Sequence, residues 1–244
     1  MTILGLFIVS ACRLTAQDKI ATTGTEPGFA VLELYTSEGC SSCPPAEALL
    51  EQIDKASADK PIYALAFHVD YFDRLGWKDV FGDPAYTKRQ YAYSRFFQGQ
   101  VYTPQLVVNG TVAGVGSNPE FVQSSLNNAL NTAAAATIQS NLKLASGSAI
   151  LNYKADGEID HTKLVVAIVQ KHAISKVTRG ENEGRTLSHA AIVRGLQEFK
   201  LSETGSGNTK IKLPAEFNQN HWDIITFLQN PRTGRIVAAS RAHI

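Results

Sequence analysis

The chain has 244 residues, of which 44% are apolar and 18% are charged, and its formal net charge is +1. This composition predicts a folded globular protein and excludes a disordered one. The near-neutral charge, with no basic stripe, argues against a nucleic-acid partner.

The first residues are typical of an export signal. Residues 1–11 read MTILGLFIVSA, an apolar run that is too short to span a bilayer and resembles the hydrophobic region of a signal peptide. The run ends in Val9-Ser10-Ala11-Cys12, which resembles the lipobox of bacterial lipoproteins, whose cysteine carries the lipid. We assign residues 1–28 to this leader and a polar tether. The protein is expected to be exported, either to the periplasm or to the envelope with a lipid on Cys12 as its membrane anchor. The alternative is an ordinary cleaved leader in which Cys12 is discarded.

Residues 29–137 alternate between β-prone and helical patterns. The two apolar runs near the start predict buried strands, and Asn109-Gly110 predicts a tight hairpin. The order is βαβ, helix, β-hairpin, helix, which is the plan of a thioredoxin-like fold. In chain order the expected elements are strand 29–35, helix 46–55, strand 61–69, helix 85–97, strands 105–108 and 111–115, and a helix from 118 to about 136.

From residue 138 onward the pattern changes to short alternating segments separated by turn signals. Several short strands at such spacing suggest a small β-sandwich. The predicted fold class is therefore α/β, with a thioredoxin-like fold followed by a smaller β-sandwich-like C-terminal domain at residues 138–244. The alternative is an extension packed on the first sheet. The strand-like segments are 139–145, 149–153, 163–170, 210–213, 223–228 and 236–240.

Two of the three cysteines form the motif Cys40-Ser41-Ser42-Cys43. A disulfide across so short a loop constrains little of the unfolded chain, so its value is more chemical than structural. Cys40 comes just before a predicted helix, whose positive end favours a thiolate. We therefore assign Cys40 as the attacking thiol and Cys43 as the resolving thiol. A zinc site is not expected, because the chain has no second cysteine pair and its histidines lack ligand spacing.

Three motifs stand out along the chain: CSSCPP after VLELYTSEG, HVDYFDRLGWKD after the second strand, and YTPQLVVNG at the third. Together they resemble a bacterial family of secreted thioredoxin-like proteins that is classed as a domain of unknown function. The likeness continues through residues 179–194 and covers nearly the whole chain from about Phe29. The resemblance implies a thioredoxin fold and export, and it brings no established reaction.

Thr103-Pro104 lies where thioredoxin-like proteins hold a cis-proline that faces the CxxC motif. In such proteins the residue before the proline offers its backbone to an extended peptide, and we expect this of Thr103. The alternative is an ordinary proline that begins a strand.

The second strand ends at His68-Val69-Asp70, on the same sheet edge as Cys40. His68 and Asp70 are candidates for stabilising the thiolate or relaying a proton. The other interpretation is that His68 caps the strand and Asp70 a turn. Thioredoxin's buried acid aligns with Leu34, so proton handling must come from elsewhere or be slow.

The leading hypothesis is an exported thiol-disulfide oxidoreductase that acts on protein thiols or disulfides without a cofactor. A second hypothesis is a copper-binding module in which two soft thiolates and His68 hold Cu(I). A third is a non-catalytic envelope adaptor. The polar segment from Gly180 to Arg185, followed by Ser188-His189, contacts the CxxC face, binds a partner, or forms a charged loop between strands, and the charged loop is the favoured interpretation.

Overall fold

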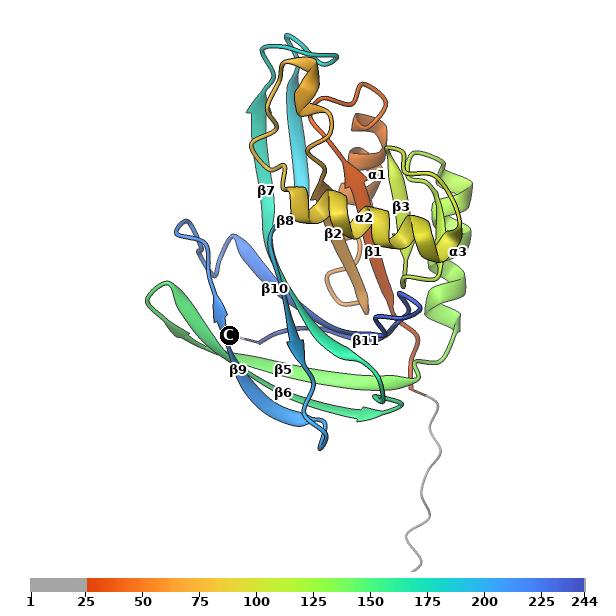
Figure 1. Cartoon of the computed structure of the whole chain (residues 1–244), viewed down its shortest axis with the longest axis vertical. Coiled ribbons are helices and arrows are strands. Elements are labelled where there is room, and N and C mark those ends of the chain that lie inside the picture. Colours follow the sequence, from red (N-terminus) through yellow and green to blue (C-terminus); the bar gives the residue numbers. More distant parts are fainter. Residues whose placement is uncertain (1–25, 244) are drawn as a thin grey trace, which may run out of the picture.

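The computed structural model describes residues 26–243, so the expected leader and Cys12 lie outside the described residues (Figure 1). Every element expected between residues 29 and 137 is present, although the last helix ends at Asn131 and residue 136 already begins a strand. The elements are β1 (Ala30–Thr36), α1 (Pro44–Lys55), β2 (Ile62–His68), the 3-10 helix η1 (Asp73–Leu75), α2 (Pro84–Phe97), β3 (Gln105–Val108), β4 (Val112–Val115), α3 (Pro119–Asn131), β5 (Ala136–Ala145), β6 (Ser148–Gly157), β7 (Lys163–Lys176), β8 (Thr186–Lys200), β9 (Ser206–Lys212), β10 (Trp222–Gln229) and β11 (Ile236–Arg241).

The architecture is α/β. Residues 26–243 form a mixed eight-stranded sheet, in the order β11-β10-β7-β8-β2-β1-β3-β4, and an antiparallel three-stranded sheet, in the order β5-β6-β9. β1 runs parallel to β2 and antiparallel to β3, so β1 is a central strand, and all of its residues are buried. Within the same residues, no helix has the length and apolarity needed to cross a membrane.

The C-terminal third does not form a separate sandwich. Strands β7, β8, β10 and β11 extend the first sheet, which they join where β8 lies parallel to β2 at Ala66 and Ile192. Only β5, β6 and β9 form the second sheet of the described chain. The alternative drawn from the sequence, an extension packed on the first sheet, therefore describes this part better than an independent domain.

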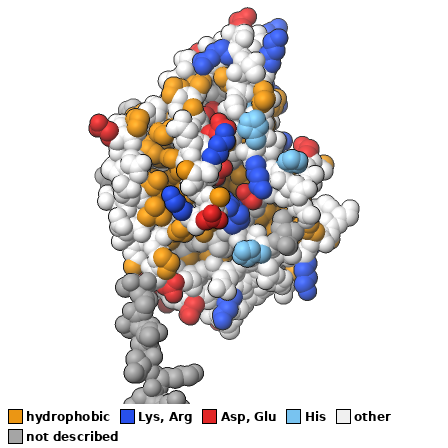
Figure 2. Space-filling model, turned by 180° about the vertical axis from the view of Figure 1, so that it is seen from behind, with side chains coloured by type: hydrophobic (Ala, Val, Ile, Leu, Met, Phe, Trp, Pro, Cys, Tyr) orange, Lys and Arg blue, Asp and Glu red, His pale blue; other side chains and the backbone are white. Residues whose placement is uncertain are grey.

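Residues 164–169 of β7, in the C-terminal extension, are buried on both faces of the sheet. Along β7, Val165 and Ala167 pack into the main core, whereas Leu164 and Val166 pack into a second core against the three-stranded sheet. Successive strand residues point to opposite faces, so a strand between two cores is apolar throughout. On the outer surface, Figure 2 shows acidic and basic side chains interspersed over one face.

A buried ion pair ties α2 to the sheet. Arg89 donates to both carboxylate oxygens of Glu33 on β1, at 2.6 and 2.9 Å, and the Tyr93 hydroxyl donates to the same carboxylate at 2.6 Å. The guanidinium also lies over the rings of Phe67 and Phe227. Glu33 thus faces α2, opposite the neighbouring Leu34, as strand alternation requires.

Candidate disulfide-exchange site

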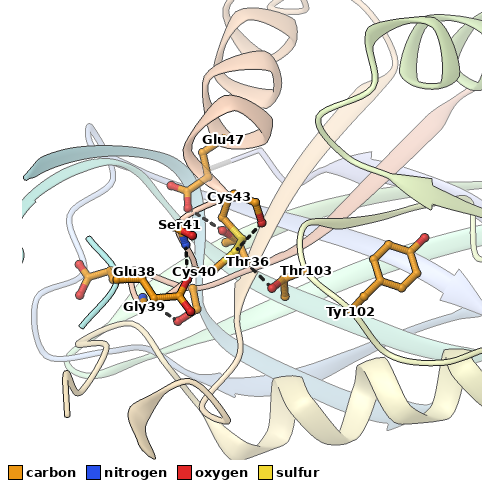
Figure 3. The surroundings of a disulfide bond; sticks show 12 residues. Thr36, Glu38, Gly39, Cys40, Ser41, Cys43, Glu47, Tyr102 and Thr103 are labelled. Carbon is orange, nitrogen blue, oxygen red and sulfur yellow. Dashed lines mark hydrogen bonds between the residues drawn. A yellow bond between two sulfur atoms is a disulfide. The ribbon is translucent and has the colours of Figure 1, made fainter. Parts of the chain in front are cut away.

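Cys40 and Cys43 form a disulfide at the N-terminus of α1, with their Cα atoms 5.4 Å apart (Figure 3). β1 ends at Thr36, a short turn follows, and Cys43 takes the N-cap position before Pro44 and Pro45 in the first turn. Proline suits that turn because the missing amide proton would have no helical partner. Both cysteines are buried, with exposed fractions of 2% for Cys40 and 0% for Cys43.

The peptide bond between Thr103 and Pro104 is cis, as expected from its position before β3. The Thr103 hydroxyl donates to Cys40 Sγ at 3.3 Å, so this segment faces the disulfide directly. The carbonyl of Pro104 accepts from the amide of Gly116, which ties the segment to the end of β4. The structure therefore brings the two sequence-predicted motifs into contact.

Residues 177–185, which join β7 to β8 and are here named the cap loop, cover the disulfide. The buried Asn182 side chain donates to the carbonyls of Glu38 and Cys40, at 2.8 and 2.9 Å. Glu181 accepts from the amide of Ser41 at 3.0 Å, and Arg185 donates to Asn182 Oδ1 at 2.7 Å. This segment is thus a loop between two strands, and it also contacts the CxxC face.

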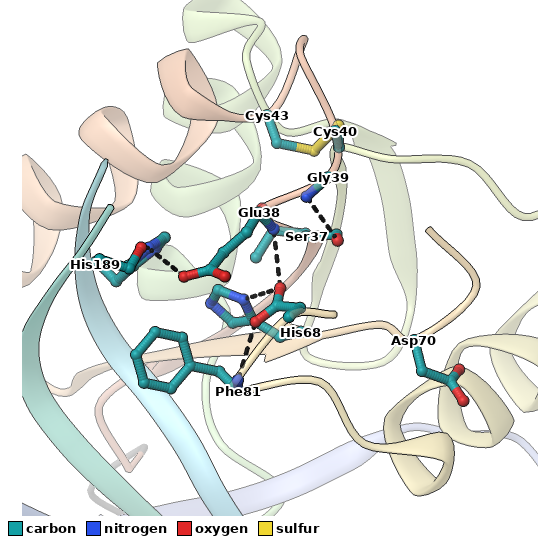
Figure 4. Close-up of polar contacts among 12 residues, drawn as sticks. Ser37, Glu38, Gly39, Cys40, Cys43, His68, Asp70, Phe81 and His189 are labelled. Atoms are coloured by element: carbon teal, nitrogen blue, oxygen red, sulfur yellow. Dashed lines mark hydrogen bonds and ion pairs between the residues drawn. A yellow bond between two sulfur atoms is a disulfide. The ribbon is translucent and has the colours of Figure 1, made fainter. Parts of the chain in front are cut away.

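A buried cluster of ionisable side chains lies beyond the turn that precedes Cys40 (Figure 4). Its members are Glu38, Glu47, His68, Asp79 and His189, with exposed fractions of 7% or less. His68 Nδ1 lies 2.8 Å from Asp79 Oδ2, and the backbone amide of Glu38 donates to the same oxygen. Burial alone would raise the pKa of Asp79, but the contact with His68 and the hydrogen bonds from the backbone amides of Glu38 and Phe81 together lower that pKa below its ordinary value.

His189 lies between two carboxylates. Its Nδ1 bonds to Glu47 Oε2 at 2.5 Å, and its Nε2 lies 3.0 Å from Ser175 Oγ and 3.4 Å from Glu38 Oε1. Burial would lower the pKa of His189, but the two carboxylates raise it to about 9. For Glu38, burial would raise the pKa, but hydrogen bonds led by that from His189 lower it; Trp77 Nε1 donates to the same carboxylate.

The family described as "Protein of unknown function (DUF1223)" matches residues 31–229. The chain belongs to the DUF1223 family. A crystal structure of protein AGR_C_4864 from Agrobacterium tumefaciens is similar to this DUF1223 chain, with 27% identity and a TM-score of 0.65, covering 89% of this chain and 95% of that one.

Two other solved structures match this DUF1223 chain only weakly. A domain of the outer membrane lipoprotein Omp28 from Porphyromonas gingivalis has 12% identity and a TM-score of 0.28, covering 46% of this chain and 88% of that one. An apo β-glucuronidase from Ruminococcus gnavus has 10% identity and a TM-score of 0.24, covering 45% of this chain and 15% of that one. No curated protein matches the chain.

Two sequence-predicted residues of the DUF1223 protein lie away from the sulfur atoms. His68 belongs to the buried cluster, and the turn from Ser37 to Gly39 lies between it and the disulfide (Figure 4). Asp70 points away from the cluster and accepts from the Thr87 hydroxyl on α2. The partner of His68 is Asp79 instead. The alternative copper site, formed by two thiolates and His68, would require the disulfide between Cys40 and Cys43 to be reduced.

Glu47 and Asp79 were not among the candidates drawn from the sequence of this DUF1223 chain, and Asn182 and His189 were named only within a polar segment, without individual roles. Glu47 follows Cys43 by four residues, so helical periodicity could have placed it on the same face. Asp79 lies in the motif HVDYFDRLGWKD, and Asn182 and His189 lie in the segment that extends the family likeness. The sequence offered contact of this segment with the CxxC face as one interpretation, and spacing alone could not decide it.

Proposed function

We propose that this DUF1223 protein is an exported thiol-disulfide oxidoreductase that acts on protein thiols or disulfides through Cys40 and Cys43. The observation that carries the proposal is a disulfide at the start of α1 that faces a cis-proline segment, with the Thr103 hydroxyl 3.3 Å from Cys40 Sγ. The strand order β2-β1-β3-β4, with β1 and β2 parallel, supports a thioredoxin-like core.

The exchange proceeds in two sulfur-transfer steps. A substrate thiolate attacks Cys40 Sγ, which forms a mixed disulfide while the bond to Cys43 breaks and Cys43 leaves as a thiolate. The second thiolate of the substrate then attacks the substrate sulfur of the mixed disulfide. This step forms the substrate disulfide and releases Cys40 as a thiolate. Two electrons pass from the substrate dithiol to the cysteine pair, and the two protons of the substrate end on the protein thiols or in water. The reverse sequence oxidises the protein's dithiol and reduces a substrate disulfide.

Substrate entry requires the cap loop to move, because Cys40 is covered in the closed form. The groups beside the sulfur, the Thr103 backbone and the cap loop, suit an extended segment of a protein substrate. Export agrees with this chemistry, since disulfides persist in oxidising compartments such as the periplasm. We propose that residues 1–28 contain the export leader and a polar tether, with Cys12 as the lipid attachment site of an envelope-anchored form.

The reduction potential of the Cys40–Cys43 pair tests the proposal. The protein is equilibrated with glutathione buffers, its thiols are alkylated, and the reduced fraction is read by mass spectrometry, with Cys40→Ser as the control that cannot form the bond. A potential between about −120 and −270 mV lies in the range of exchange catalysts. Values near the upper end indicate an oxidant, and values near the lower end a reductant.

A second candidate function is a non-catalytic envelope adaptor, which the burial of both cysteines favours. In that case the disulfide is structural, and its potential lies below about −300 mV. Such a value would overturn the oxidoreductase proposal.

A further inference from the structure

Three buried side chains from separate elements converge within the cluster beneath the disulfide. Glu47 comes from α1, His68 from the end of β2 and His189 from β8. Each offers one possible ligand atom, and these three atoms lie within 4.8 Å of one another. Metal–ligand bonds of about 2.0 Å put the donor atoms of a tetrahedral site roughly 3.3 Å apart, so a modest contraction would bring them to bonding distance.

Each histidine has a polar partner on one ring nitrogen. Asp79 Oδ2 lies 2.8 Å from His68 Nδ1. Ser175 Oγ lies 3.0 Å from His189 Nε2, and the nearest oxygen of Glu38 is farther away at 3.4 Å. Metal-binding histidines typically donate their other ring N–H to a carboxylate or another oxygen, which Asp79 supplies to His68.

The second nitrogen of each ring is the one available to a metal. His189 Nδ1 bonds to Glu47, and His68 Nε2 is buried with no hydrogen-bond partner among residues 26–243.

The buried carboxylates of the cluster outnumber its imidazoles, which favours binding of a cation. Three carboxylates, those of Glu38, Glu47 and Asp79, are buried here, and the cationic partners available to them within the cluster are the two imidazoles. Uncompensated negative charge in the interior is costly, and burial of carboxylates is normally accompanied by ion pairing or metal coordination.

We propose that Glu47, His68 and His189 form a binding site for a divalent transition-metal ion of the zinc class. Two imidazole nitrogens and one carboxylate oxygen suit zinc and its neighbours, whereas calcium and magnesium prefer oxygen ligands alone. Binding displaces the proton shared by His189 and Glu47, and both groups then turn to the metal. Three protein ligands leave the fourth tetrahedral position open. The proposal is independent of disulfide exchange, since the cysteines supply no ligand.

Co²⁺ is the probe, because its d–d absorption becomes intense in tetrahedral coordination. The full chain, oxidised so that Cys40 and Cys43 stay bonded, is refolded with Co²⁺ so that slow entry into a closed site cannot pass for failure to bind. We expect one equivalent of Co²⁺ to bind, with the release of close to one proton at neutral pH. One equivalent of Zn²⁺ should then displace the Co²⁺. His68→Gln should weaken binding at least about 100-fold, and the outer-shell change Asp79→Asn about 10- to 100-fold.

His172→Gln is the matched control, because that histidine lies on β7 and bonds to Ser188 in an exposed contact. It should bind like the parent protein. If His68→Gln does not fold, Asp79→Asn and the X-ray absorption spectrum of the parent complex provide the test, with two imidazoles expected around the metal. The proposal is overturned if no equivalent binds after refolding, if the ligand and outer-shell variants bind as tightly as the parent, or if the absorption spectrum contains no imidazole. The unpartnered His68 nitrogen would then mark a buried water.

Discussion

The proposed function requires the cap loop to move away from Cys40, so removing the Asn182 side chain should make that movement easier. Asn182 donates to the carbonyls of Glu38 and Cys40 and accepts from Arg185. The first two bonds join the cap loop to the segment that contains Cys40, and the bond from Arg185 lies within the loop. In the open form, water replaces them. The variant Asn182→Ala therefore destabilises the closed form and leaves the open form almost unaffected.

The magnitude follows from the bonds that are lost. Each neutral hydrogen bond contributes about 1 kcal/mol net, and a buried acceptor left unpaired costs about 1–3 kcal/mol. The carbonyl of Cys40 keeps a second donor, the amide of Cys43, but Asn182 is the donor that the Glu38 carbonyl loses. We therefore expect Asn182→Ala to reduce the stability of the closed loop, relative to the open loop, by about 2 kcal/mol. This change raises the equilibrium constant for opening roughly 30-fold.

The assay is the rate at which dithiothreitol reduces the disulfide under native conditions, read by alkylation and mass spectrometry. Asn182→Ala should be reduced roughly 30-fold faster than the parent, in line with the opening equilibrium. Asn152→Ala is the matched control, because that side chain makes an exposed hydrogen bond to Asn141 far from the site. Urea unfolding separates loop opening from global destabilisation. Reduction at the parent rate in a folded Asn182→Ala protein would refute a gating role for the loop.

Three further predictions concern the buried charges and the hydroxyl at the disulfide. The two carboxylates raise the pKa of His189 from 6.5 to about 9, so its proton stabilises the fold fully below pH 6.5 and this stabilisation is lost as pH rises through 9. In metal-free protein, the free energy of unfolding measured with urea should thus fall by a few kcal/mol between pH 6.5 and 9, and His189→Gln should abolish this fall. Arg89→Met leaves Glu33 buried without its cation and should lower the free energy of unfolding by about 3–5 kcal/mol. A decrease below about 1 kcal/mol would contradict the buried ion pair. Thr103→Val removes the donor to Cys40 Sγ, so in the reduced protein the pH profile of alkylation should shift upward by about one pKa unit, and an unchanged profile would exclude that contact.

The local part of the fold was predictable because its signals are short in range. The CxxC motif before a helix, the proline that begins it and the Asn109-Gly110 turn each depend on a few neighbouring residues, and the structure has helix and hairpin where they were expected. The helix expected to reach residue 136 ends earlier, at Asn131, because the alanines that follow favour a helix only by propensity and the chain there enters β5.

The pairing of β8 with β2, which connects the C-terminal strands to the first sheet, could not be predicted from local signals. β8 was not among the expected strands, although it has 15 residues. Its alternation is broken where Ile168 of β7 pairs with Gly195 but Val169 pairs with Val193, so that Arg194 is an extra residue in β8. A bulge moves later side chains to the other face, so period-two reasoning fails there. Its neighbour in the sheet, β2, precedes it by more than a hundred residues, a separation that no local pattern encodes.

The same strand explains why the site is not complete within residues 29–137. β8 carries His189 into the cluster beneath Cys43, and the loop before it carries Asn182 over Cys40. Without these residues Glu47 would lose its imidazole partner, the Glu38 carbonyl would lose its donor, and the edge of β2 would be unpaired. An open strand edge invites pairing with other chains, and a buried carboxylate without a cationic partner opposes folding. The C-terminal extension is therefore part of the structure that builds the disulfide site.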